Sequence, residues 1–189
     1  MDSDLVLISR VVLLNDERAF ADLMKKYQRP MRRYFLVQTN GDEALSDDLA
    51  QETFIHAWQH LDSFHGLSGF GTWLYRIAHN TWCNWYARHH DLLSLDDPVV
   101  SAAAEASADS LSLNQSPSSP DDGMGEASAL RLALARLSDG ERTCITLFYY
   151  QELSIREIHA VTGYPVGTIK SHLARARASL KQILSNENR

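Results

Sequence analysis

The chain has 189 residues and a formal net charge of −6, and its hydrophobic and charged fractions are those of an ordinary water-soluble protein. This length allows one or two domains with real cores, and no apolar run is long enough to cross a bilayer. Asp2 and Asp4 stand where a signal peptide would be basic, and Cys83 and Cys144 form no CxxC pair, so we expect a cytoplasmic protein with two reduced thiols.

The charge is unevenly distributed along the chain. Residues 91–126 contain eight acidic residues and no Lys or Arg, whereas residues 127–189 contain nine basic residues against five acidic ones. The local field steers a polyanion more than the total charge does, so the negative total does not exclude nucleic acid as a partner. We predict a helical domain over 1–90, a flexible acidic linker over 91–126 that is rich in Ala and Ser, and a second helical domain over 127–189.

Helical spacing of apolar residues organises the first 90 residues. It predicts helices over residues 5–14, from Ala19 onward with an interruption at Pro30, over 43–61 and over 72–90. The second of these carries a basic cluster that fits a solvated face as well as it fits phosphate contact. The cluster consists of Lys25, Lys26, Arg29, Arg32 and Arg33.

One face of the helix over 43–61 is acidic and amide-rich. Asp48, Gln51 and Glu52 stay outside the apolar stripe, close to Phe54 and Trp58. This face fits plain solvated surface, and it equally fits a docking site for a basic partner helix.

Residues 62–71 form a Gly/Ser loop that contains Phe64 and Ser68, and an aromatic-rich helix follows it. The loop phenylalanine is either tucked into the core or held ready for a ligand. In the helix, aromatic residues interleave with Arg76, Asn80 and Asn84. This combination suits single-stranded nucleic acid, because aromatic rings stack on bases and side-chain amides form hydrogen bonds with them. Stacking contributes about 1–3 kcal/mol per base. The alternative is that the aromatic residues are mostly core.

The C-terminal part predicts helices over 129–137 and 142–150 and then a helix-turn-helix. Ser154 is a candidate N-cap, and Gly163 can take the left-handed conformation that ends the first helix. An apolar stripe at Val166, Ile169, Leu173, Ala176 and Leu180 follows. It leaves a polar face that suits a DNA major groove, although a helical hairpin with a solvated basic face has the same pattern. The residues of this face are Lys170, Ser171, Ala174, Arg175 and Arg177.

Catalytic motifs are missing from the sequence. There is no P-loop, GxGxxG or GxSxG motif, and we expect no catalytic residue and no cofactor. His56 and His60 have the i, i+4 spacing of zinc ligands, but Ala57 stands where a zinc protease needs Glu. We therefore expect no metal site.

Taken together, the motifs resemble the extracytoplasmic-function (ECF, group 4) sigma factors of the sigma-70 family. The resemblance covers nearly the whole chain except the linker. It rests on Asp48-Leu49-Ala50-Gln51-Glu52-Thr53-Phe54, Leu61-Asp62-Ser63-Phe64, Thr72-Trp73-Leu74-Tyr75-Arg76-Ile77-Ala78-His79-Asn80, Glu152-Leu153-Ser154 and Pro165-Val166-Gly167-Thr168-Ile169-Lys170-Ser171-His172-Leu173-Ala174-Arg175-Ala176-Arg177. It implies an all-α fold of two small helical domains, called region 2 and region 4.

This resemblance also implies partners and roles. Core RNA polymerase would be bound by region 2, at Asp48, Gln51, Glu52 and Phe54. The minus-10 promoter element would be opened by region 2, with Phe64 and Ser68 in a loop that captures a flipped base and Arg76, Asn80 and Asn84 on the helix that receives the strand. The minus-35 element would be read by region 4, at Lys170, Ser171, Ala174, Arg175 and Arg177. An anti-sigma factor, typically at the inner membrane, would silence the free protein and its stress-response genes.

Two positions depart from the family's pattern, and two other classes of protein remain open. Asn84 stands where many members carry Asp, and His172 stands where Arg is common, which lowers fixed charge on the recognition helix. An ordinary transcription regulator would keep the helix-turn-helix and use the N-terminal half as a sensor. A pure interaction adaptor would keep the fold without DNA binding.

Overall fold

The computed structural model describes residues 3–94 and 126–187, and within these ranges the chain is helical with no strand. The elements are α1 (Asp4–Leu14), α2 (Glu17–Gln38), α3 (Glu43–Gln59), the 3-10 turn η1 (Leu61–Ser63), α4 (Phe70–Ser94), α5 (Glu126–Ala135), α6 (Asp139–Tyr149), α7 (Ile155–Thr162) and α8 (Val166–Glu187). In the described part, no helix is both long and apolar enough to span a membrane.

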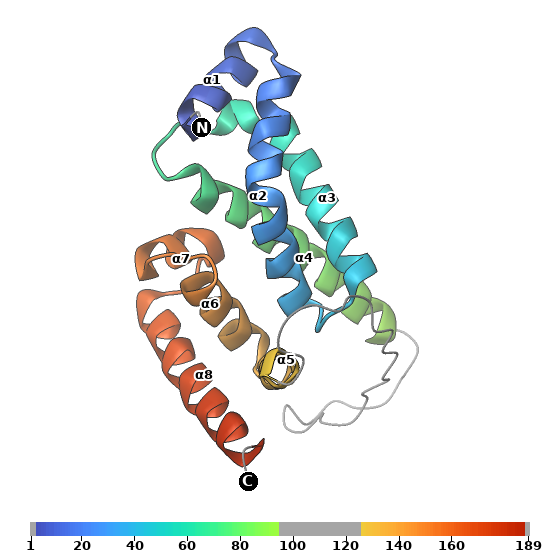
Figure 1. Ribbon diagram of the computed structural model, residues 1–189, viewed down its shortest axis with the longest axis vertical. Helices are drawn as coiled ribbons and strands as arrows, with labels where there is room; N and C mark the ends of the chain where they lie inside the picture. Colours follow the sequence, from blue (N-terminus) through green and yellow to red (C-terminus); the bar gives the residue numbers. More distant parts are fainter. Residues whose placement is uncertain (1–2, 95–125, 188–189) are drawn as a thin grey trace.

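Helices α1 to α4 form an N-terminal bundle in which α2 and α4 lie at the centre (Figure 1). Its fully buried side chains include Leu23, Met31, Tyr34, Phe35, Leu49 and Leu74. The expected interruption at Pro30 is wrong, because α2 runs through it. Proline removes one backbone donor, but the burial of Met31, Tyr34 and Phe35 directly after it offsets that loss.

The expected linker lies almost entirely outside the described residues. Helix α4 continues to Ser94 and α5 begins at Glu126, so only the ends of the range 91–126 are described, and both are helical. The predicted helix over 43–61 ends earlier, at Gln59, and the 3-10 turn η1 begins two residues later at Leu61.

The C-terminal bundle, α5 to α8, contains the predicted helix-turn-helix. Helix α7 begins with a capping box, in which the Ser154 hydroxyl accepts from the Glu157 N–H and the Glu157 carboxylate accepts from the Ser154 N–H. Gly163 ends α7 in the left-handed region at φ 73°. The expected N-cap at Ser154 and the expected helix end at Gly163 are confirmed. Val166 is an exception to the apolar stripe, because it opens α8 and is 40% exposed.

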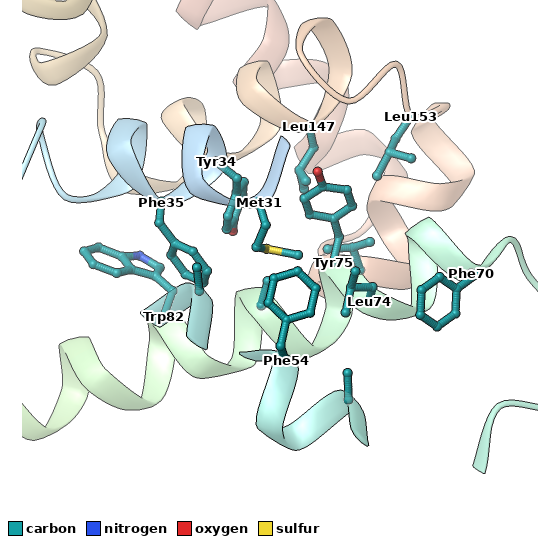
Figure 2. Packing of buried hydrophobic residues seen from close by; sticks show 14 of the residues in the cluster. Met31, Tyr34, Phe35, Phe54, Phe70, Leu74, Tyr75, Trp82, Leu147 and Leu153 are labelled. Carbon is teal, nitrogen blue, oxygen red and sulfur yellow. The ribbon is translucent and has the colours of Figure 1, made fainter. Parts of the chain in front are cut away.

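The two bundles share one apolar cluster. Figure 2 shows Leu147 of the C-terminal bundle beside Tyr75 of the N-terminal one, and Leu153 and Tyr34 belong to the same cluster. Helix α7 packs along α4, and α6 packs on α2. The helix-turn-helix therefore lies directly beside the aromatic helix, and this contact determines the geometry of the site.

Candidate nucleic-acid interface

The predicted recognition face of α8 is open to solvent. Ile169, Leu173 and Ala176 are buried against the rest of the C-terminal bundle. The five side chains predicted to meet DNA, Lys170, Ser171, Ala174, Arg175 and Arg177, are all exposed. The apolar stripe is therefore the side of α8 that packs on the bundle, and the polar side is left open to a DNA duplex.

Arg175 is held in place by two neighbours. Its Nε donates to Glu141 Oε1 at 2.9 Å, and its Nη2 lies 3.1 Å from His172 Nδ1. Glu141 also accepts from the Ser138 backbone N–H at the start of α6. The first turn of α6 therefore orients the guanidinium on α8, a contact that the sequence did not indicate.

Along α4, the three polar side chains predicted to meet the minus-10 strand are exposed. Asn80 and Asn84 follow Arg76 at intervals of four residues, so all three lie along one side of the helix. Arg76 differs from the other two because its Nε donates to the backbone oxygen of Ala160 in α7, at 2.7 Å.

The loop between η1 and α4 carries Phe64 in an aromatic cluster. The Phe64 ring is half-buried and meets Phe70 and Trp73 edge-on, with both pairs of ring centroids 5.6 Å apart. Ser68 is exposed, and Leu67 is 95% exposed. In the free chain the ring thus rests on the aromatic cluster, within an otherwise open loop.

A groove of about 690 Å³, lined by both apolar and polar side chains, runs between α2 and α3. Of the residues predicted to bind polymerase, Gln51 and Phe54 line it, while Asp48 and Glu52 lie on α3 outside the lining. Phe54 is only 7% exposed, so it forms the floor of the groove and contributes to the core. The sequence did not single out Met24 and Ile55, which line the groove and are exposed.

Most of the basic cluster on α2 is paired within the chain. Lys25 and Lys26 bond to Asp22 and Asp4, and Arg32 bonds to Glu43 and Asp47. The guanidinium carbon of Arg33 lies 5.9 Å from the centroid of the Tyr150 ring. These pairs favour a solvated, charge-balanced face over phosphate contact.

His79 is buried where α4 meets the helix-turn-helix. It is 5% exposed, its ring lies edge-on to Tyr164 at 6.2 Å between centroids, and its Nε2 lies 3.6 Å from Cys83 Sγ. Burial lowers the pKa of His79 to about 4. The imidazole is therefore neutral at physiological pH, next to two groups that are also uncharged there.

We expect folding stability to fall on mild acidification because of His79. The unfolded chain takes up a proton near the ordinary pKa of 6.5 and the folded chain only near 4, so protonation between these values favours unfolding. The free energy of unfolding should drop by about 1 kcal/mol between pH 7.5 and 5.5. Urea titrations at both pH values check this against His79→Gln, and an equal drop in the variant contradicts it.

The described residues contain no group of three His, Cys, Asp or Glu side chains that would hold a metal ion. The geometry presents instead an open basic helix face, an exposed polar strip on α4 with an aromatic loop at its end, and a groove between α2 and α3. Two such polar surfaces and a separate groove fit the predicted nucleic-acid contacts and the predicted protein-docking surface.

Comparison with known proteins defines the family. Sigma-70 region 2 matches residues 23–91, and Sigma-70, region 4 matches residues 127–180. The RNA polymerase sigma factor YlaC of Bacillus subtilis is 32% identical over 165 residues, which is 85% of this chain and 89% of YlaC. The ECF RNA polymerase sigma-E factor of Escherichia coli K12 is 35% identical over 183 residues, 94% of this chain and 92% of that protein. The chain belongs to the ECF sigma factors of the sigma-70 family.

Solved structures agree in fold. CnrH, in complex with the cytosolic domain of CnrY, matches with a TM-score of 0.67 and 25% identity over 98% of this chain and 99% of CnrH. The sigma factor RpoE of Bartonella quintana, in complex with the anti-sigma factor NepR, matches with a TM-score of 0.64 and 25% identity over 87% of this chain and 97% of RpoE. Because the N-terminal half matches sigma-70 region 2, it is not the sensor domain of an ordinary transcription regulator.

Proposed function

We propose that this sigma factor docks on core RNA polymerase through the α2–α3 groove and directs transcription initiation with two separate DNA contacts. The observation that carries this proposal is the division of exposed surface. The recognition face of α8, the strip on α4 and the groove lie on different elements, so duplex, single strand and polymerase can be bound together. The polymerase performs the chemistry, and the sigma factor contributes binding energy only.

The groove fits a helical partner with a basic edge. Met24, Ile55 and Trp58 line it and expose apolar surface, and Asp48 is exposed on α3, one residue after the lining residue Asp47. Apolar contact supplies affinity, while the acidic edge attracts opposite charge and fixes the orientation of the partner.

Reversal of charge at Asp48 tests this docking. We expect Asp48→Lys to weaken binding to core polymerase about tenfold, because it sets like charges against each other. Asp62→Lys, at an exposed position of η1, is the matched control and should bind as the wild type does. Competition against a labelled sigma factor for limiting core polymerase measures both. Equal loss in the two variants would reject α3 as the docking element.

For duplex recognition, we propose that α8 reads the minus-35 element through Lys170, Ser171, Ala174, Arg175 and Arg177. Arg and Lys reach guanine edges and phosphates, and the small Ala174 side chain lets the helix approach the bases. For opening, we propose that Phe64 and Ser68 trap an extruded base while Arg76, Asn80 and Asn84 hold its strand, as base-flipping proteins do.

For regulation, we propose that an anti-sigma factor holds this protein inactive in the cytoplasm. If the anti-sigma factor is membrane-bound, the complex lies at the inner membrane. We also propose that the genes transcribed with this sigma factor serve a stress response. Support comes from the similar sigma factor RpoE, whose structure was solved in complex with the anti-sigma factor NepR.

Transcription in vitro tests the proposal as a whole. Core polymerase with this protein should start transcripts from fragments of the source genome at sites that share two upstream motifs. Initiation no different from that of core polymerase alone would reject the proposal and favour the adaptor.

A further inference from the structure

Arg175 keeps only one edge of its guanidinium free for a ligand. A guanidinium has five N–H donors in a fixed planar fork. The bonds to Glu141 and His172 use one hydrogen on Nε and one on Nη2. The remaining donors are the two of Nη1 and the second one of Nη2. Because Nη1 and Nη2 form the tip of the side chain, Arg175 can still donate two parallel hydrogen bonds from its end.

His172 is the acceptor in its bond with Arg175. Arginine has no acceptor atom, so Nδ1 of His172 carries the lone pair and the hydrogen of the ring lies on Nε2. The arginine that is common at this position in the family could not accept such a bond, because it has donors only. The bond therefore depends on the histidine by which this chain departs from the family's pattern.

A glycine makes room for the His172 ring. A methyl group at Gly140, in the first turn of α6, would lie 2.9 Å from both Cε1 and Nε2 of His172. Such distances are too short for non-bonded carbon, so a larger residue at position 140 would displace the ring. Gly140 does not have a positive φ, so its backbone does not require glycine. The space that the His172 ring occupies is therefore the physical reason for glycine at this position.

Glu141 is a fixed anchor for Arg175. Its side chain is only 14% exposed, and it accepts from the Ser138 N–H as well as from Arg175. Burial raises the pKa of Glu141, but the hydrogen bonds from Ser138 and Arg175 outweigh burial and hold the pKa below its ordinary value. The carboxylate is therefore ionised, and a charge-assisted bond from a mostly buried partner restricts the exposed Arg175 side chain.

We propose that three positioning residues, Gly140, Glu141 and His172, aim the recognition arginine at the major groove and thereby set a preference for guanine at one position of the minus-35 element. Guanine presents two acceptors, O6 and N7, in the major groove, and they match the two donors at the tip of Arg175. An arginine that rotates freely would also reach phosphates, which carry no sequence information. This inference rests on the proposed role of Arg175 in reading the minus-35 element.

Sequencing of selected DNA tests the base preference. The full chain, assembled with core polymerase, selects from duplexes randomised over the minus-35 motif that transcription in vitro identifies. The position that loses its preference in Arg175→Ala is the one that Arg175 reads, and we expect guanine there for the wild type. His172→Ala and Gly140→Ala should each lower the enrichment of guanine at that position about fivefold, because each loses one hydrogen bond that orients Arg175. The other positions should not change.

Three controls separate positioning from folding. His172→Asn places an amide oxygen close to the position of Nδ1 and should keep most of the guanine preference. Gly140→Ala should melt at no lower temperature than the wild type, because a helix favours Ala over Gly. In a protein that already carries Arg175→Ala, His172→Ala should change nothing further at the same position. A further loss there would overturn the proposal, because His172 would then act without Arg175.

Nitrogen-15 NMR of the free full chain measures the hold on Arg175 without DNA. The Nε–H of Arg175 should be protected from exchange with water, and Glu141→Ala should remove that protection. An unprotected Nε–H in the wild type would overturn the positioning. So would a base other than guanine at the position that Arg175 reads, or unchanged guanine enrichment in both Gly140→Ala and His172→Ala. An Arg175→Ala protein that keeps every base preference would instead reject the proposed minus-35 reading, and the NMR result would still decide whether Arg175 is held.

Discussion

Arg175→Ala should abolish recognition of the minus-35 element and leave polymerase binding intact. Arg175 is the member of the recognition face that other side chains orient, through Glu141 and His172. A positioned arginine that meets a guanine edge contributes about 1–3 kcal/mol of discrimination, so duplex affinity should fall about 10- to 100-fold. Electrophoretic shifts with a duplex selected by in-vitro transcription measure this loss.

Lys181→Ala is the matched control for Arg175→Ala. Lys181 is an exposed cation further along α8, outside the predicted recognition face. Its removal should cost only the nonspecific, salt-dependent part of the affinity. If both variants lose the same affinity, or if the Arg175 variant also loses polymerase, α8 is not the element that reads the sequence.

Phe64→Ala should impair strand opening far more than closed-complex formation. The ring rests edge-on against Phe70 and Trp73, and capture of a base would replace this contact with stacking worth about 1–3 kcal/mol. Permanganate reactivity of the minus-10 thymines should therefore fall about tenfold or more, with closed-complex affinity nearly unchanged.

Leu67→Ala provides the comparison within the same loop. Leu67 is 95% exposed, and its truncation removes apolar surface without disturbing the aromatic cluster. Normal opening is expected for this variant, and thermal melting of both variants checks that neither has unfolded. Permanganate footprints that do not change in Phe64→Ala would remove Phe64 from the opening step.

The elements of the fold were largely predictable from the sequence because their signals are local. The capping box at Ser154 and Glu157, the glycine at position 163 and the apolar stripe of α8 each depend on neighbours within a few residues. Pro30 shows where such reasoning fails, since the burial of Met31, Tyr34 and Phe35 by distant helices outweighs one lost hydrogen bond.

The contacts between the bundles were not predictable. Nothing near Arg76 in sequence indicates that its partner is the backbone oxygen of Ala160, and a backbone oxygen leaves no mark on residue identity. The same holds for Gln151, whose two bonds reach Tyr75 and Pro30. Contacts between residues far apart in the chain depend on packing, which periodicity does not encode.

If α8 recognises duplex DNA while the N-terminal bundle opens it, transcription from a pre-melted template separates the two roles most directly. A promoter whose minus-10 segment is held open by mismatches should restore transcription by the Phe64→Ala protein with core polymerase to near the wild-type level. The same template should leave the Arg175→Ala protein defective. Rescue of both variants, or of neither, would contradict this division of roles between α8 and the N-terminal bundle.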